Sequence, residues 1–119
     1  MGIKLFDSEL KVMELLWDEG DLSALQIIAK LKESIGWNRT TTYTIIRKCI
    51  EKGAIERSEP NFICRALISR CESQKFEVDE LLNKMFHGSR DLFIAALLSD
   101  EKLTADEVKK LREYIKSFE

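Results

Sequence analysis

Arginine, lysine, threonine and tyrosine side chains recur on one side of the segment 37–53, WNRTTTYTIIRKCIEKG. At helical spacing this side has no carboxylate before Glu51. Arginine can bind guanine O6 and N7 in the DNA major groove, threonine can bind a base edge, and both can bind phosphate. The segment therefore predicts a DNA-contacting helix, although an ordinary solvated helix face remains the alternative. The expected contacts are Arg39, Thr40, Thr41, Tyr43, Thr44, Arg47 and Lys48.

The opposite side of this segment suits a protein core. Its residues recur at intervals of three and four, the spacing of a buried helix face: Thr42, Ile45, Ile46, Cys49 and Ile50. Asn38 suits the N-cap, where its side-chain oxygen can accept a backbone N–H. Gly53 suits the left-handed position after the helix. The segment therefore predicts a two-faced helix between these residues.

Positive charge is concentrated in the central third of the chain. The 119 residues have a net charge of −2, which alone argues against a nucleic-acid partner. Residues 36–70, however, include seven basic and three acidic side chains, a net charge of +4. The segments 1–35 and 71–119 each have a net charge of −3. This distribution predicts a modest basic surface around the two-faced helix.

Two shorter helices are expected before the two-faced helix. Apolar residues recur at helical spacing from about Ser8 to Asp18. A second helix begins at Ser23, which forms a capping box with Gln26. Three short helices, the third with a polar and basic face, are typical of a helix-turn-helix.

A β-hairpin is expected directly after the two-faced helix. Residues 54–58 and 62–67 favour strands, and Pro60 and Asn61 suit the second and third positions of a β-turn. A hairpin in this place is typical of a wing, with a plain structural hairpin as the alternative. Two arginines are candidates for phosphate contacts: Arg57 and Arg65.

The last third of the chain favours three helices. Capping boxes at Ser69 and Thr104 begin two of them, and Ser89 suits the N-cap of a short helix in between. Isolated helices could not bury their apolar surface, which predicts a homodimer, with packing against residues 1–70 as the alternative. The candidate dimer contacts are Leu81, Met85, Leu92, Phe93, Leu97, Val108, Leu111, Ile115 and Phe118.

The expected fold is mostly α with a small β-wing. Residues 1–69 are expected to form a winged helix-turn-helix DNA-binding domain. Residues 70–119 are expected to form a helical dimerisation domain of three helices.

No residue pattern indicates an enzyme, a cofactor or a metal site. The three cysteines, Cys49, Cys64 and Cys71, form no CxxC pair, and the chain has one histidine. No nucleophile motif or phosphate-binding loop is present. The longest apolar run, residues 92–98, is too short for a membrane span, and the start MGIKLF does not match a signal peptide. We expect a cytoplasmic protein that has reduced cysteines and is not inserted in a membrane.

Three stretches together resemble the BlaI/MecI-type penicillinase repressors: LFDSELKVMELLWDEGDLSALQIIAKL, GWNRTTTYTIIRKCIEKGAI and GSRDLFIAALLSDEKLTADEVKKLREYI. The most characteristic parts run from Glu9 to Trp17 and from Trp37 to Arg47. Each part is short, but their order along nearly the whole chain is specific.

This resemblance implies a homodimeric winged-helix repressor that binds inverted-repeat operators in double-stranded DNA and dimerises through its C-terminal helices. It also implies control of β-lactam-resistance or related genes, relieved by proteolysis through a membrane sensor-protease pathway. The resemblance places the scissile bond between Ala96 and Leu97, where the best-studied relatives have an Asn-Phe pair. The wing, SEPNFICR, is also less basic than in many relatives and has no glycine. Because no cysteine follows Cys71, the copper-responsive branch of the family is not indicated.

The same fold also permits a function of a different class. A winged helix can serve as a protein-interaction module without binding DNA, and the acidic sequence pI of about 5.6 favours that alternative. The clustered basic charge and the carboxylate-free helix face favour DNA. Salt-dependent binding to a duplex distinguishes the two functions.

Overall fold

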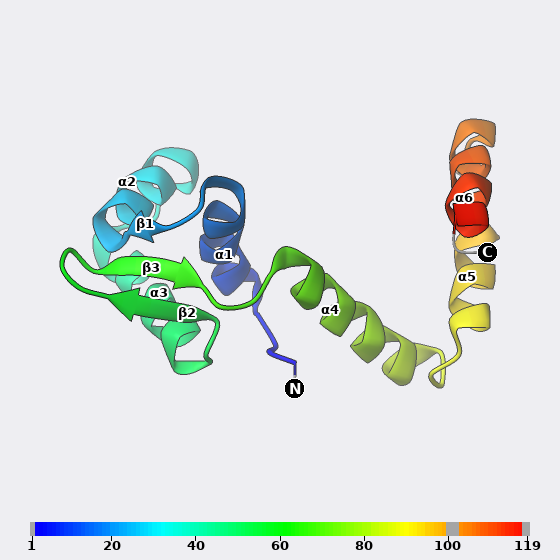
Figure 1. Cartoon of the computed structure of the whole chain (residues 1–119), viewed down its shortest axis with the longest axis horizontal. Coiled ribbons are helices and arrows are strands. Elements are labelled where there is room, and N and C mark those ends of the chain that lie inside the picture. The colour runs from blue at the N-terminus through cyan, green and yellow to red at the C-terminus, as the bar shows by residue number, and fades with distance from the viewer. Residues whose placement is uncertain (1, 100–102, 118–119) are drawn as a thin grey trace. The chain divides into compact units, whose positions relative to one another are not determined.

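The computed structural model describes residues 2–99 and 103–117. The elements in chain order (Figure 1) are α1 (Asp7–Glu19), β1 (Leu22–Ser23), α2 (Ala24–Ile35), α3 (Arg39–Glu51), β2 (Ile55–Ser58), β3 (Ile63–Ala66), α4 (Arg70–Met85), α5 (Arg90–Leu98) and α6 (Ala105–Ser117). The chain divides into two compact units, Met1–Glu77 and Val78–Glu119, and the division lies inside α4. The functional boundary expected between residues 69 and 70 stays a prediction. No helix in the described ranges is long and apolar enough to cross a bilayer.

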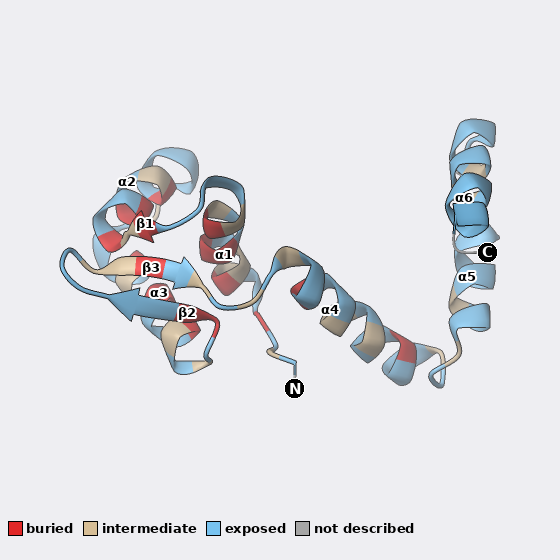
Figure 2. Cartoon of the chain, viewed as in Figure 1, coloured by how far each residue is buried: buried red, intermediate tan, exposed pale blue. Residues whose placement is uncertain are grey.

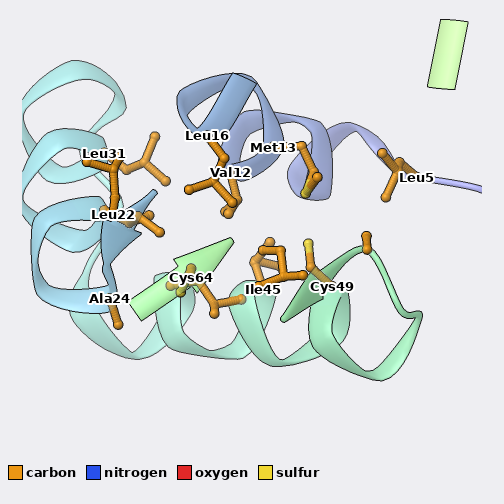
Figure 3. Packing of buried hydrophobic residues seen from close by; sticks show 14 residues of the cluster. Leu5, Val12, Met13, Leu16, Leu22, Ala24, Leu31, Ile45, Cys49 and Cys64 are labelled. Carbon is orange, nitrogen blue, oxygen red and sulfur yellow. The ribbon is translucent and has the colours of Figure 1, made fainter. Parts of the chain in front are cut away.

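The first unit is built around a core that α1, α2, α3 and the sheet share. Met13 and Val12 of α1 face Ile45 and Cys49 of α3 across this core (Figure 3). Buried residues are concentrated in these elements (Figure 2). The core-facing side predicted for α3 is confirmed, because its buried residues are Thr42, Ile45, Ile46 and Cys49.

The sheet has three strands, whereas the sequence predicted only the two strands of the hairpin. The central strand β3 pairs antiparallel with β2 on one side and with β1 on the other. The strand β1 is two residues long and pairs Leu22 with Cys64, far along the chain. Such a short strand depends on its distant partner, so no local pattern indicates it. Three helices followed by this hairpin confirm the predicted winged helix-turn-helix.

Hydrogen bonds fix both ends of α3 at the predicted residues. Asn38 Oδ1 accepts the backbone N–H of Thr41 at 2.8 Å, as an N-cap does. At the other end Gly53 has a φ of +83°, a left-handed conformation that a side chain would strain. The Ala54 N–H then donates to the Cys49 carbonyl at 2.9 Å, which is the hydrogen bond of a Schellman motif that spans more residues.

The predicted caps of the later helices are also present. Ser69, Ser89 and Thr104 each accept a backbone N–H through the side-chain hydroxyl, at 3.0, 3.2 and 3.1 Å. These local bonds explain why the starts of α4, α5 and α6 were predictable from the sequence.

The second unit buries little of its apolar surface. Among its described residues only Leu82 is buried, and α5 and α6 have no buried residue (Figure 2). Phe86 and Phe93 pack edge to face with ring centroids 5.4 Å apart. Phe93, Val108 and Leu111 are half-buried, and Phe118 lies outside the described residues. The other candidate dimer contacts are exposed: Leu81, Met85, Leu92, Leu97 and Ile115.

Candidate nucleic-acid interface

The outer face of α3 is polar and open to solvent. Of the residues of α3 that were predicted to contact DNA, Tyr43 is half-buried. The Thr44 hydroxyl donates to the Thr40 carbonyl at 2.9 Å, which leaves the hydroxyl oxygen able to accept a further hydrogen bond. The remaining predicted contacts on this helix are all exposed: Arg39, Thr40, Thr41, Thr44, Arg47 and Lys48.

Tyr43 connects this face to the wing. Its ring lies 5.9 Å from the ring of Phe62, which follows the hairpin turn, and the Arg39 guanidinium lies 5.6 Å from the Tyr43 ring centroid. On the other side of Phe62, the Arg57 guanidinium lies 3.7 Å from the ring centroid. The four side chains therefore form a continuous row from α3 to β2, in which two aromatic rings lie between two guanidinium groups. Sequence reasoning missed Phe62, which it placed in a strand.

The hairpin turn holds Phe62 in an unusual backbone conformation. Asn61 and Phe62 have φ angles of 74° and 49°, and the preceding Glu59–Pro60 peptide is cis. The Phe62 N–H donates to Glu59 Oε2 at 3.3 Å, and its carbonyl accepts the Ala24 N–H at 2.9 Å. Aromatic residues rarely adopt positive φ, and these bonds stabilise the conformation in which Phe62 lies beside Tyr43 of α3.

Both arginines of the wing are paired with carboxylates of the wing itself. Arg57 Nε donates to Glu59 at 2.7 Å, and Arg65 donates to Glu56 at 2.8 Å. The hydrogen bond from Arg57 lowers the pKa of Glu59 below its ordinary value. The hydrogen bond to Glu56 raises the pKa of Arg65, and Asp21 adds a smaller effect. The wing is therefore charge-balanced over this hairpin.

A buried ion pair fixes the end of α3 against α1. Glu9 of α1 has a side chain only 1% exposed and accepts Lys52 Nζ at 2.6 Å and the Phe6 N–H at 2.7 Å. The Lys52 ammonium also donates to the Lys4 carbonyl at 2.8 Å and lies 3.9 Å from the Phe6 ring centroid. A buried carboxylate needs such partners. This contact positions α3, and sequence reasoning missed it because its two residues are far apart in the chain.

The charges of the central third divide into two groups. Lys52, Arg57, Arg65 and Arg70 are each in an ion pair, the last with Glu14 and Asp18 of α1. Three of the seven basic residues of segment 36–70 take part in none of the ion pairs found among the described residues, and all three lie on α3: Arg39, Arg47 and Lys48. The basic side chains of this segment that are outside these ion pairs therefore lie on the outer face of α3.

The cysteines offer no reactive thiolate in the core. Burial raises the pKa of the Cys49 thiol to about 12 and that of Cys64 to about 11. Both thiols are therefore protonated at neutral pH, while Cys71 is exposed. The described residues include no cluster of three or more His, Cys, Asp or Glu side chains suited to a metal ion. The expectation that the protein needs no metal or cofactor stays a prediction.

The described elements define a winged helix-turn-helix protein with a helical C-terminal extension. The model of the penicillinase repressor family matches residues 5–117 of this chain. The chain belongs to the penicillinase repressor family.

Named relatives are similar over most of their length. The chain is 22% identical to the penicillinase repressor of Bacillus licheniformis over 110 residues, 91% of this chain and 86% of the relative. It is 25% identical to the methicillin resistance regulatory protein MecI of Staphylococcus aureus over 111 residues, 92% of this chain and 90% of the relative.

Two solved structures share the winged-helix fold. The solution structure of the DNA-binding domain of the repressor BlaI superposes with a TM-score of 0.55 at 24% identity, and covers 60% of this chain and 93% of that one. The monomeric form of Bacillus licheniformis BlaI, solved in complex with the blaP half-operator, gives a TM-score of 0.51 at 24% identity over 58% of this chain and 87% of that one.

Proposed function

We propose that this chain is a homodimeric transcriptional repressor that binds an inverted-repeat DNA operator through the outer face of α3. One observation carries this proposal: the unpaired cations of the basic segment all lie on that face. Family membership supports it, as does the likeness to BlaI, which was solved with a half-operator. By analogy with the named relatives, the controlled genes would be β-lactam-resistance genes or related operons.

In this proposal α3 enters the major groove and each residue type has a distinct task. Arg39 and Arg47 supply bidentate contacts to guanine or phosphate, and Lys48 binds phosphate. Thr40, Thr41 and Thr44 bind base edges, sugar or phosphate. Tyr43 is half-buried, so only part of its side chain can contact DNA, and its packing on Phe62 connects the wing with α3.

Dimerisation is the second part of the proposal. Two half-sites bound by one dimer give an affinity far above that of either half. The exposed apolar residues of the second unit support an intermolecular partner, because a single chain leaves Met85 61% and Ile115 56% exposed.

The rival function, a protein-interaction module, makes a different prediction for binding to DNA. A repressor that releases counterions from DNA should lose affinity steeply as salt rises. We would measure fluorescence anisotropy of a labelled mixed-sequence duplex with the full-length chain at two salt concentrations. Salt-sensitive binding supports the repressor, and the absence of binding at low salt would favour the rival.

We also propose that repression ends by proteolysis within residues 89–102, of which 100–102 lie outside the described residues, with Ala96–Leu97 as the favoured bond. Both residues are exposed but lie inside α5, and a protease needs an extended segment. Local opening of α5 must therefore precede cleavage, and its lack of buried residues makes opening easy. Intact-mass analysis of the protein from induced cells tests this. Derepression with the chain still at full length would contradict it.

A further inference from the structure

The two arginines of the wing lie on opposite faces of the sheet. Residues directly opposite in an antiparallel pair share a face, and successive residues of a strand alternate. Arg57 is opposite the buried Cys64 and so shares the face of the sheet on which Cys64 is buried. Arg65 is opposite Glu56 on the other face, where Asp21 also raises its pKa. The two arginines are therefore not equivalent candidates for DNA contact.

Only Arg57 belongs to the row of side chains that leads to α3. Its guanidinium stacks on Phe62 at 3.7 Å, and Phe62 contacts Tyr43 at 5.9 Å between ring centroids. A phosphate bound by the outer face of α3 would therefore have Arg57 as the nearest cation of the wing. Arg65 has no such link to α3 among the described contacts.

Glu59 holds the Nε edge of this same guanidinium. One carboxylate oxygen accepts Arg57 Nε at 2.7 Å, and the other accepts the Phe62 N–H at 3.3 Å. Both members of the pair are largely exposed, at 49% for Arg57 and 60% for Glu59. Both side chains are therefore accessible to a DNA phosphate.

We propose that Glu59 is a positioning residue that limits DNA affinity, because its carboxylate competes with a DNA phosphate for Arg57. This inference rests on the proposed DNA-binding function. In the free protein Glu59 keeps Arg57 against Phe62 and neutralises its charge. In the complex the guanidinium stays stacked on the ring while the phosphate displaces the carboxylate.

The competition has a magnitude that can be measured. Exposed ion pairs of this type are weak, so relief of the competition should tighten DNA binding only about 1.4- to fivefold per protomer. Glu59→Gln should also steepen the dependence of log affinity on log salt, by up to about 0.9 per protomer, because Arg57 is then not neutralised in the free protein and its contact with phosphate adds fully to counterion release. A purely structural role of Glu59 would not steepen the salt dependence.

The test uses the full-length chain, a mixed-sequence duplex and two charge-neutral variants. Glu59→Gln removes the charge and keeps an oxygen for the Phe62 N–H. Glu56→Gln, on the other face of the sheet, is the matched control. Anisotropy titrations across a salt series give the affinity and the salt slope, and thermal melting of each variant reports whether the fold is kept.

The expected result is a higher affinity and a steeper salt slope for Glu59→Gln, with less than half of either change for Glu56→Gln. The increase should also vanish when Arg57→Gln is added. Equal increases in the two single variants, or an increase that survives Arg57→Gln, would overturn the proposal, because general charge repulsion would then explain it. An unchanged affinity in a folded Glu59→Gln variant would also overturn it. A wild-type chain that binds no duplex would instead contradict the proposed function.

Discussion

The two units of this chain bury their apolar residues very differently. The first unit encloses a continuous core that includes Val12, Ile27 and Ile46, none of which has exposed surface. The second unit has one buried residue, Leu82, among its described positions, although its helices are also rich in leucine and isoleucine. The first unit thus has the core of a self-sufficient domain, whereas the second needs another surface against which to bury its apolar side chains. The difference suggests that DNA contact and assembly are assigned to separate parts of the chain.

The largest expected effect comes from a charge placed on the apolar side of α6. Leu111→Asp should dissociate the dimer, because an unpaired carboxylate in an apolar interface is strongly unfavourable. Loss of the second half-site should then weaken operator binding by roughly 10²–10⁴. Sedimentation equilibrium and anisotropy check both effects. Lys109→Asp lies on the opposite side of the helix by spacing and is the control. An undisturbed dimer in Leu111→Asp would contradict the assembly model.

The next effect concerns the internal support of the first unit. Lys52→Met leaves the Glu9 carboxylate buried without its cation, which should lower the free energy of unfolding by about 3 kcal/mol. Lys30→Met removes the exposed pair with Glu19 and should cost less than about 1 kcal/mol. Urea denaturation of the two variants compares the losses. Equal losses would mean that the buried pair does not support α3.

A smaller effect is expected when a single arginine of α3 or of the wing is replaced. Arg47→Ala should cost about 1–3 kcal/mol of operator binding if it contacts a guanine. Arg65→Ala should cost much less, because Glu56 already pairs with that arginine on the outer face of the sheet. Anisotropy titrations at fixed salt measure both. A larger loss for Arg65→Ala would transfer the main contact from α3 to the wing.

The smallest effect at neutral pH concerns the thiols. Only Cys71 is exposed, so a thiol reagent should modify one cysteine of the native chain, and intact mass reports the count. Above the ordinary thiol pKa of 9.0 the unfolded chain loses the Cys49 proton, while the folded chain keeps it up to a pKa of about 12. The free energy of unfolding should therefore decrease as pH rises through this window, and the decrease should be smaller in Cys49→Ala. Rapid labelling of two or three native thiols would contradict the buried placement.

Features with local signals were predictable from the sequence. Asn38 and Gly53 bounded α3 correctly because caps depend on hydrogen bonds between near neighbours. The same holds for the capping box at Ser69. The apolar period of residues 42–50 also identified the buried side of α3, because a helix repeats its faces at a fixed interval.

Features that depend on long-range geometry were not predictable. The strand β1 forms only against β3, and the Glu9–Lys52 pair joins residues that only the fold brings together. The unequal roles of Arg57 and Arg65 depend on the register of the hairpin, since a shift of one residue would place both arginines on the same face of the sheet. From the sequence both arginines were candidates for phosphate contacts, whereas in the structure each is paired with a glutamate.

Selection of bound sequences from a random duplex library tests the central claim, that α3 recognises DNA, most directly. The wild-type full-length chain should enrich an inverted repeat whose half-sites are about one helical turn apart, or a multiple of it. Arg47→Ala should enrich the same repeat with the base preference lost at one position in each half-site. If the wild type enriches no motif, or if the motif is unchanged by substitutions along the whole outer face of α3, then α3 is not the element that recognises DNA.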